Sequence, residues 1–147
     1  MRRGVNLANS VRVLVVDDYE PFRRVVVSQL QKQPGLVIAE ASDGFEAVQK
    51  AKDLQPDLIL LDIGLPKLNG IEAARQIRQL SPKSKILFVS EHRSVDIAEA
   101  ALNTGAAGYV VKSDGTRDLS VAVDAVLKGE QFLSATLAGE VSVSSRT

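Results

Sequence analysis

The chain has 147 residues, and its 18 basic and 18 acidic side chains leave no net charge. This length allows one domain with its own core, and the balanced charge argues against a strongly basic nucleic-acid-binding surface. Cysteine is absent, which excludes disulfides and thiolate metal sites. No segment has the roughly 18 apolar residues of a membrane span, and the N-terminus lacks the apolar stretch of a signal peptide. We therefore expect a soluble cytoplasmic protein.

After a lead at 1–10, which we expect to be flexible, two kinds of segment alternate. Short apolar runs typical of buried strands occupy 11–16, 36–40, 58–61, 85–89 and 107–111. Apolar residues at helical spacing lie between and after them, in five sets: Phe22, Val25, Val26 and Leu30; Phe45, Val48 and Ala51; Ile71, Ala74 and Ile77; Val95, Ala98, Ala101 and Leu102; and Leu119, Ala122, Val123 and Val126. The alternation predicts an α/β domain with a parallel sheet and helices on both faces.

Two local signals bear on the ends of these segments. Asn69 with Glu72 three residues later is a capping-box pattern, which predicts the start of the third helix. After the fifth helix, Phe132, Leu133 and Leu137 are apolar enough to pack against the domain, whereas residues 142–147 are typical of disorder.

Three aspartates follow two of the buried runs. Asp17 and Asp18 end the first run, and Asp62 ends the third. Functional groups of parallel sheets gather at the carboxyl ends of the strands, so these carboxylates lie close together if the two strands are neighbours. Like charges at that distance disfavour joint ionisation, and a hard divalent cation such as Mg²⁺ relieves the repulsion. The alternative is that one aspartate caps a helix and the others are solvated turn residues.

Two polar residues follow other strands of the predicted sheet. Lys112 follows the fifth strand, where its ammonium can pair with Asp62 and later hold a phosphoryl oxygen, and Ser90 follows the fourth. Taken singly, both are more often solvated or helix-approach residues. The backbone carbonyl of Gly64 is a further candidate metal ligand. An aspartate nucleophile beside Mg²⁺, a lysine and a hydroxyl suits the formation of an aspartyl phosphate.

In their order and spacing, these motifs resemble the receiver domain of two-component response regulators, in the CheY-like superfamily. The resemblance covers 11–128 and rests on a few segments: Val15-Val16-Asp17-Asp18, Leu60-Leu61-Asp62-Ile63 with Pro66 and Gly70, Val89-Ser90, and 105–112. It implies a flavodoxin-like (βα)5 three-layer sandwich with the strand order 2-1-3-4-5. Residues 129–147 would then be a C-terminal tail or a linker remnant.

The resemblance also implies a regulatory phosphoacceptor rather than an enzyme. Asp62 would accept a phosphoryl group from a sensor histidine kinase, with help from Lys112 and Ser90. Mg²⁺ or Mn²⁺ would be held by Asp18, Asp62 and the Gly64 carbonyl, with Asp17 contributing largely through water.

Ser90 and Tyr109 would form the switch pair of such a domain. Phosphorylation would draw the Ser90 hydroxyl inward and allow Tyr109 to turn from solvent toward the core. The surface that changes would comprise the fourth helix, the fifth strand and the fifth helix. The alternative for Tyr109 is a half-buried strand aromatic with its hydroxyl in water.

Residues 108–113 and 129–134 resemble the NarL/FixJ (LuxR-type) subgroup, whose members usually carry a helix-turn-helix output domain after this point. The tail favours a fragment of a transcription factor, or a descendant of one, over a stand-alone receiver, and we expect no nucleic acid to bind this chain itself. Three residues depart from the usual pattern. Ser113 replaces the common proline after Lys112, Glu91 replaces a small residue beside the phosphate site, and His92 occupies a position that tunes dephosphorylation. The alternative for His92 is an exposed loop residue.

The fifth helix has an unusually wide apolar surface. Its polar residues Ser120, Asp124 and Lys128 form one stripe, and nearly all other positions are apolar. Some of this surface must be covered, either by the C-terminal tail or by a second copy of the chain. We predict a homodimer through the fifth helix, with the first or fourth helix, and tail coverage is the alternative.

Three other functions fit part of the pattern. A magnesium-dependent phosphohydrolase of the haloacid-dehalogenase type would need a second aspartate where Gly64 lies and a cap domain over the site. A flavodoxin-like domain that binds FMN would need phosphate-binding donors where the acidic Asp17-Asp18-Tyr19-Glu20 lies. A pseudo-receiver usually lacks one or more site residues, and none is lost here.

Overall fold

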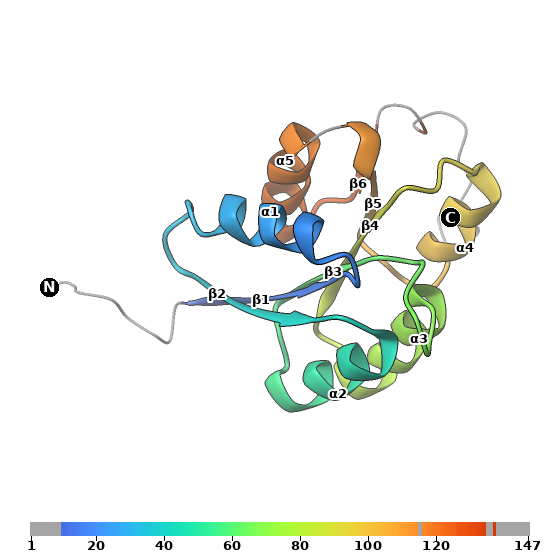
Figure 1. Ribbon diagram of the computed structural model, residues 1–147, viewed down its shortest axis with the longest axis horizontal. Coiled ribbons are helices and arrows are strands. Elements are labelled where there is room, and N and C mark those ends of the chain that lie inside the picture. The colour runs from blue at the N-terminus through green and yellow to red at the C-terminus, as the bar shows by residue number, and fades with distance from the viewer. Residues whose placement is uncertain (1–9, 115, 135–136, 138–147) are drawn as a thin grey trace, which may run out of the picture.

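The computed structural model describes residues 10–114, 116–134 and 137. All strand pairs in its single sheet are parallel. The strands are β1 (Val11–Val16), β2 (Leu36–Ala41), β3 (Leu58–Leu61), β4 (Lys85–Ser90), β5 (Gly108–Val111) and β6 (Phe132–Leu133), in the order β2-β1-β3-β4-β5-β6. Figure 1 shows the helices on both sides of the sheet. The predicted flavodoxin-like sandwich is confirmed, with a sixth strand at one edge.

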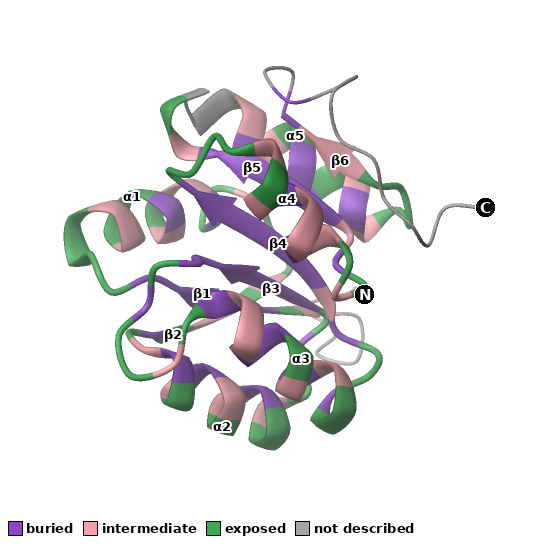
Figure 2. Cartoon of the chain, turned by 90° about the vertical axis from the view of Figure 1, so that its right-hand side faces the viewer, coloured by how far each residue is buried: buried purple, intermediate pink, exposed green. Residues whose placement is uncertain are grey.

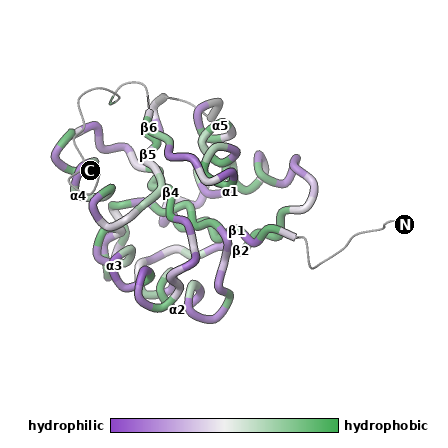
Figure 3. The backbone as a smooth tube through the Cα atoms, turned by 180° about the vertical axis from the view of Figure 1, so that it is seen from behind, coloured by the Kyte–Doolittle hydropathy of each residue, from purple (hydrophilic) through white to green (hydrophobic). Residues whose placement is uncertain are grey.

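Each face of the sheet has its own apolar core, in keeping with the three-layer fold. The helices α1 (Glu20–Leu30) and α5 (Thr116–Leu127) pack on one face. The other face carries α2 (Gly44–Leu54), α3 (Gly70–Leu80) and α4 (Val95–Leu102). The central strands are buried on both faces, which explains why β3 reads as an uninterrupted run of Leu and Ile (Figure 2). Their apolar character stands out against the polar loops in Figure 3.

Local capping fixes where several helices begin. The predicted cap of α3 is confirmed, because the Asn69 side chain accepts a hydrogen bond from the Glu72 amide at 3.0 Å. The next residue, Gly70, passes so close to the backbone of Asp62 that a Cβ atom there would lie 2.0 Å from the Asp62 carbonyl oxygen. A glycine at this position therefore allows α3 to begin directly beneath the end of β3.

Two residues assigned to apolar helix faces by their spacing lie in solvent instead. Val25 of α1 and Phe45 of α2 are 47% and 57% exposed. The core contact of α2 is made by small residues, Ala47 and Ala51, which are fully buried and let the helix approach the sheet closely. Apolar spacing alone therefore predicts a wider buried face on these helices than the structure shows.

The segment after α5 does pack, as its apolar residues allowed. Strand β6 pairs with β5, so the sheet continues beyond the expected domain boundary at residue 128. Leu137 is buried in the same apolar cluster as Tyr109. The expectations for residues 1–9 and 142–147 fall outside the described residues. Among the described helices, none is long and apolar enough to cross a membrane.

Candidate functional site

Strand register brings the predicted polar residues to one edge of the sheet. Val16 is paired with Leu61, so Asp17 and Asp62 leave their strands side by side. The Asp62 amide continues this ladder by donating to the Val16 carbonyl at 3.1 Å. One strand further on, Ser90 is paired with Val111, immediately before Lys112. Residues from four separate stretches therefore meet at the carboxyl ends of β1, β3, β4 and β5, as predicted.

The three aspartates form a cluster of carboxylates. Asp17, Asp18 and Asp62 each have a carboxylate oxygen that lies within 4.8 Å of the others. Asp17 and Asp62 are buried, and Asp18 is exposed at the rim. Oxygen donors of this kind and spacing fit a hard divalent cation, because such a cation binds carboxylates and offsets their mutual repulsion. The set therefore fits the metal that the sequence predicted.

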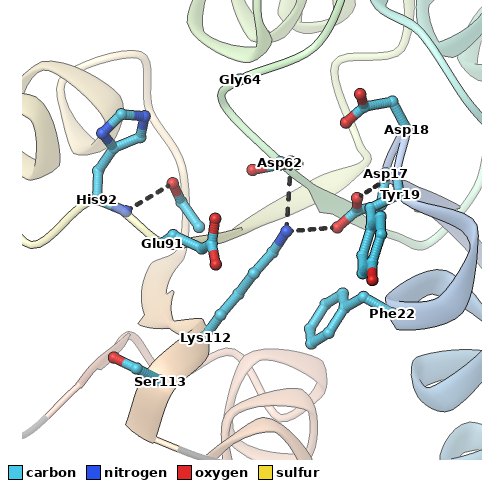
Figure 4. A pocket seen from close by; sticks show the side chains of 11 residues that line it. Asp17, Asp18, Tyr19, Phe22, Asp62, Gly64, Glu91, His92, Lys112 and Ser113 are labelled. Carbon is cyan, nitrogen blue, oxygen red and sulfur yellow. Dashed lines mark hydrogen bonds and ion pairs between the residues drawn. The ribbon is translucent and has the colours of Figure 1, made fainter.

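Lys112 crosses the cluster and pairs with two of its members (Figure 4). Its Nζ lies 2.7 Å from Asp17 Oδ2 and 3.4 Å from Asp62 Oδ2. Burial alone would lower the pKa of Lys112, but the hydrogen bond to Asp17 and the charges of Asp62 and Asp17 outweigh burial and raise it. The ammonium is therefore kept charged next to the carboxylate that the sequence identified as the nucleophile.

Asp62 is held in a chemically unfavourable setting for a carboxylate. Its Oδ1 accepts a hydrogen bond from the Ile63 amide at 2.8 Å, which fixes the orientation of the group. Burial raises the pKa of Asp62, and the charge of Asp17 raises it further, while Lys112 acts in the opposite direction. The net pKa is raised, so an ion or group that neutralises the carboxylate relieves an electrostatic cost.

Ser90 and Tyr109 lie behind this cluster, in the core. Both are fully buried. The Ser90 Oγ accepts from the His92 amide at 3.2 Å, and the Tyr109 hydroxyl donates to the His92 carbonyl at 2.9 Å. Burial, and after it the charge of Asp62, raises the pKa of Tyr109, while a hydrogen bond with Ser90 acts against them. Tyr109 is thus not a half-buried aromatic with its hydroxyl in water: it occupies the inward position and ties β5 to the loop after β4.

An open cleft of about 670 Å³ leads from solvent to the carboxylates. Gly64, Glu91 and His92 line it and are all exposed. Figure 4 shows Glu91 and His92 on the side of the loop after β4, across the cleft from Asp18 and Tyr19. Asp62 is therefore accessible to a ligand through a rim that carries a carboxylate and an imidazole.

The structure adds residues that sequence reasoning did not connect with the site. Lys112 Nζ lies over the Phe22 ring, 4.5 Å from the ring centroid. Arg23 donates to the Asp17 carbonyl at 2.7 Å and pairs with Glu40 at 2.8 Å. Apolar spacing places Phe22 only on the apolar face of α1. Its position in the first turn after the aspartate pair is the one sequence signal that could have placed it at the site.

Chemically, the site combines a buried carboxylate with neutralising partners in an open cleft. Asp62 can act as a nucleophile toward an electrophilic phosphorus, and Lys112 can offset charge on the incoming oxygens. The described residues that line the cleft form no cover over it, and the loop after β1 presents carboxylates where a flavin phosphate would need donors. The geometry therefore favours transfer from an accessible donor.

Comparisons with known proteins agree with this geometry. The model of the response regulator receiver domain family matches residues 13–124. Transcriptional regulatory protein DegU of Brevibacillus brevis is 36% identical over 134 residues, which cover 90% of this chain and 56% of that protein. Transcriptional regulatory protein LiaR of Bacillus subtilis (strain 168) is 36% identical over 132 residues, 89% of this chain and 63% of that protein. The chain thus spans about three fifths of the length of these relatives.

Solved structures show the same architecture. A two-component response regulator of the LuxR family from Aurantimonas sp. SI85-9A1 is 34% identical, with a TM-score of 0.85 over 90% of this chain and 95% of that chain. The signal receiver domain of NarL from Mycobacterium tuberculosis is also 34% identical, with a TM-score of 0.77 over 83% of this chain and 99% of that chain. Neither the hydrolase nor the flavin-binding alternative finds support in these matches. The chain therefore belongs to the response regulator receiver family of two-component systems, a family that is regulatory rather than one of conventional enzymes, and it has relatives of the NarL/FixJ type.

Proposed function

We propose that this chain acts in the cytoplasm, where Asp62 accepts a phosphoryl group from a phosphohistidine of a sensor histidine kinase. A carboxylate oxygen of Asp62 forms the new P–O bond while the P–N bond of the donor breaks, and the released imidazole takes a proton from water. The observation that carries this proposal is the placement of Asp62 at the base of an open cleft, between Lys112 at 3.4 Å and two further carboxylates. The chain would assist only its own phosphorylation and dephosphorylation.

The carboxylates would hold Mg²⁺ or Mn²⁺ in this reaction. Asp17, Asp18 and Asp62 supply side-chain oxygens, and the Gly64 carbonyl is our candidate for a backbone ligand. Gly64 lines the cleft, which supports this choice. When bound, the metal would offset negative charge on the transferred group. Asp17 already accepts from Lys112 and from the Tyr19 amide, which fits a contribution made largely through water.

Lys112 and Ser90 would hold the phosphoryl oxygens after transfer. The Lys112 ammonium already lies beside Asp62, and charge-assisted hydrogen bonds to phosphoryl oxygens are strong. Ser90 ends the neighbouring strand, and its hydroxyl accepts a bond that a small shift of the loop after β4 would release. Because Tyr109 donates to the same loop, a shift at Ser90 would alter the packing of Tyr109. Ser90 and Tyr109 would therefore act as the switch pair.

The change would reach an output through α4, β5, α5 and the adjoining strand β6. The Ser134 amide donates to the Tyr109 carbonyl at 3.0 Å, and the buried Ser134 hydroxyl accepts from the Val111 amide at 2.8 Å. The segment after α5 is thus bonded to the same strand that carries Tyr109. Since the relatives are longer and two are named as transcriptional regulators, we infer control of transcription if a DNA-binding domain follows in the full gene.

The exposed pair Glu91 and His92 would tune the rates of phosphorylation and dephosphorylation. Glu91 places a negative charge at the mouth of the cleft, where an anionic phosphodonor must pass. We expect Glu91→Ala to accelerate phosphorylation by a small acyl phosphate, because the substitution removes bulk and charge repulsion. Rates from mass spectrometry of timed samples would measure the effect, and equal rates in both proteins would contradict it.

A homodimer through α5 remains a proposal, with α1 as the favoured second element. Most of the apolar surface of α5 is covered by the sheet, but Val121 stays 54% exposed. The preceding residue, Ser120, lines a surface hollow together with the exposed Val25 of α1. Part of the remaining surface is covered by Phe132 of β6, as the tail alternative expected. Light scattering should show a dimer that Val121→Lys weakens, and a wild-type chain that stays monomeric at high concentration would remove the idea.

The main test is stoichiometric labelling of Asp62. The protein would be incubated with Mg²⁺ and a small phosphodonor, and then its mass would be measured. We expect the mass of one phosphoryl group on the wild type and none on Asp62→Asn, with the label lost when EDTA replaces Mg²⁺. Label at another residue, or steady hydrolysis of a phosphate ester without label, would overturn the proposal.

A further inference from the structure

Phe22 lies closer to the reacting groups than its place on the apolar side of α1 suggests. Its ring centroid is 4.5 Å from Lys112 Nζ, and the ring lines the same cleft as Asp62 (Figure 4). The Lys112 side chain is only 12% exposed, so the ring contacts an ammonium that is largely removed from water. An ammonium within about 6 Å of an aromatic face is attracted by the ring quadrupole, and more strongly where water is excluded.

The contacts of Lys112 show why such a support matters. The ammonium is shared between Asp17 at 2.7 Å and Asp62 at 3.4 Å, and the shorter contact draws it away from the nucleophile. A flexible four-carbon stem has many rotamers, and the charge at its end is useful to Asp62 only in a few of them. The Phe22 ring restricts this freedom without occupying an anion site, because it accepts no proton and competes with neither carboxylate.

We propose that Phe22 is a positioning residue that holds the Lys112 ammonium over Asp62 before and after phosphoryl transfer. The attraction of the ring does not depend on whether the ammonium faces a carboxylate or a phosphoryl oxygen, so it persists through the reaction. This inference deepens the proposed function and rests on it, since it assigns Lys112 the task of neutralising the phosphoryl group. It predicts that an aromatic face, rather than apolar bulk alone, is required at position 22.

The test is a double-mutant cycle that separates this role from simple packing of α1. Phe22→Leu keeps an apolar side chain but removes the ring, whereas Phe22→Tyr keeps the ring and serves as the matched control. Each would be made in the wild-type and in a Lys112→Met background, which removes the ammonium but keeps an apolar stem. Initial rates of Asp62 labelling by a small acyl phosphate would be measured at saturating Mg²⁺.

We expect Phe22→Leu to slow labelling by about threefold to tenfold in the wild-type background and by less than about twofold with Lys112→Met. Phe22→Tyr should stay within about twofold of the wild type. Equal slowing by Phe22→Leu in both backgrounds, or no slowing in either, would overturn the proposal, because Phe22 would then act on packing alone or not at all.

Two further measurements keep the inference separate from the proposed function. Urea unfolding of the same four proteins of the cycle measures the coupling between Phe22 and Lys112 without any phosphorylation. A favourable coupling with no labelling of the wild type would sink the phosphoacceptor assignment and with it the catalytic part of this inference. Labelling of the wild type with no coupling in rate or stability would sink only the role of Phe22. If Phe22→Leu does not fold, Phe22→Met replaces it.

Discussion

Gly108 is the residue through which the docking of β6 on β5 can be tested most directly. A Cβ atom at this position would lie 2.5 Å from the Phe132 carbonyl oxygen and 2.9 Å from Leu87 Cδ1. Leu87 can move its side-chain end, but the Phe132 carbonyl belongs to the backbone of β6. Gly108→Ala should therefore push β6 away from the sheet while leaving the rest of the domain folded.

The structure sets the size of the expected effect. Displacement of β6 removes at least three hydrogen bonds: Phe132 amide to Ala107 carbonyl, Ser134 amide to Tyr109 carbonyl, and Val111 amide to Ser134 hydroxyl. At about 1 kcal/mol each they sum to about 3 kcal/mol, and exposure of the buried Leu137 adds about 2 kcal/mol. Full detachment would thus cost about 5 kcal/mol, whereas a small shift of β6 costs about 1–3 kcal/mol. Because the protein takes the cheaper response, we expect a loss of about 1–3 kcal/mol in the free energy of unfolding.

Urea unfolding and amide hydrogen exchange would measure this effect. The amides of Val111 and Ser134 should lose protection, whereas those of β1 and β3 keep theirs relative to global unfolding. Gly64→Ala is the matched control, because no heavy atom outside Gly64 and its two chain neighbours lies within 4 Å of a Cβ there. Its stability should stay within about 0.5 kcal/mol of the wild type. Unchanged stability and unchanged protection in Gly108→Ala would refute the claim that β6 depends on this close approach.

Two further predictions concern the site itself. Without metal at neutral pH, Asp62→Asn should raise the melting temperature by a few degrees, since the raised pKa of Asp62 means that the folded state disfavours its charge. The wild type becomes less stable as pH rises from the unfolded toward the folded pKa of Asp62. Thermal melts should therefore show that the difference in melting temperature between variant and wild type shrinks as pH falls toward 3.8. An Asp62→Asn variant that is less stable than the wild type at pH 7 would contradict this prediction. Tyr109→Phe should lower the free energy of unfolding in urea by about 1 kcal/mol, because the hydrogen bond to the His92 carbonyl is lost. The same loss should speed amide exchange in the loop after β4, and unaltered exchange there would count against that bond.

The fold and most of the site were predictable from local sequence because each depends on a short-range pattern. Buried parallel strands must be apolar on both faces, so β3 is recognisable from Leu58 to Leu61 alone. Polar residues that end such strands necessarily share one edge of the sheet, which is why Asp17, Asp62 and Lys112 could be grouped before their distances were known.

Only the tertiary structure shows the features that depend on how closely segments distant in the sequence pack together. The inward position of Tyr109, the ring of Phe22 under Lys112 and the solvent exposure of Val25 and Phe45 are all set by how closely a helix or loop packs on the sheet. Local sequence specifies which groups end the strands, since strand period and burial act within a few residues. Contacts between segments more than twenty residues apart decide which of those groups touch. Such contacts also place β6 at the edge beside β5, and no local pattern encodes them.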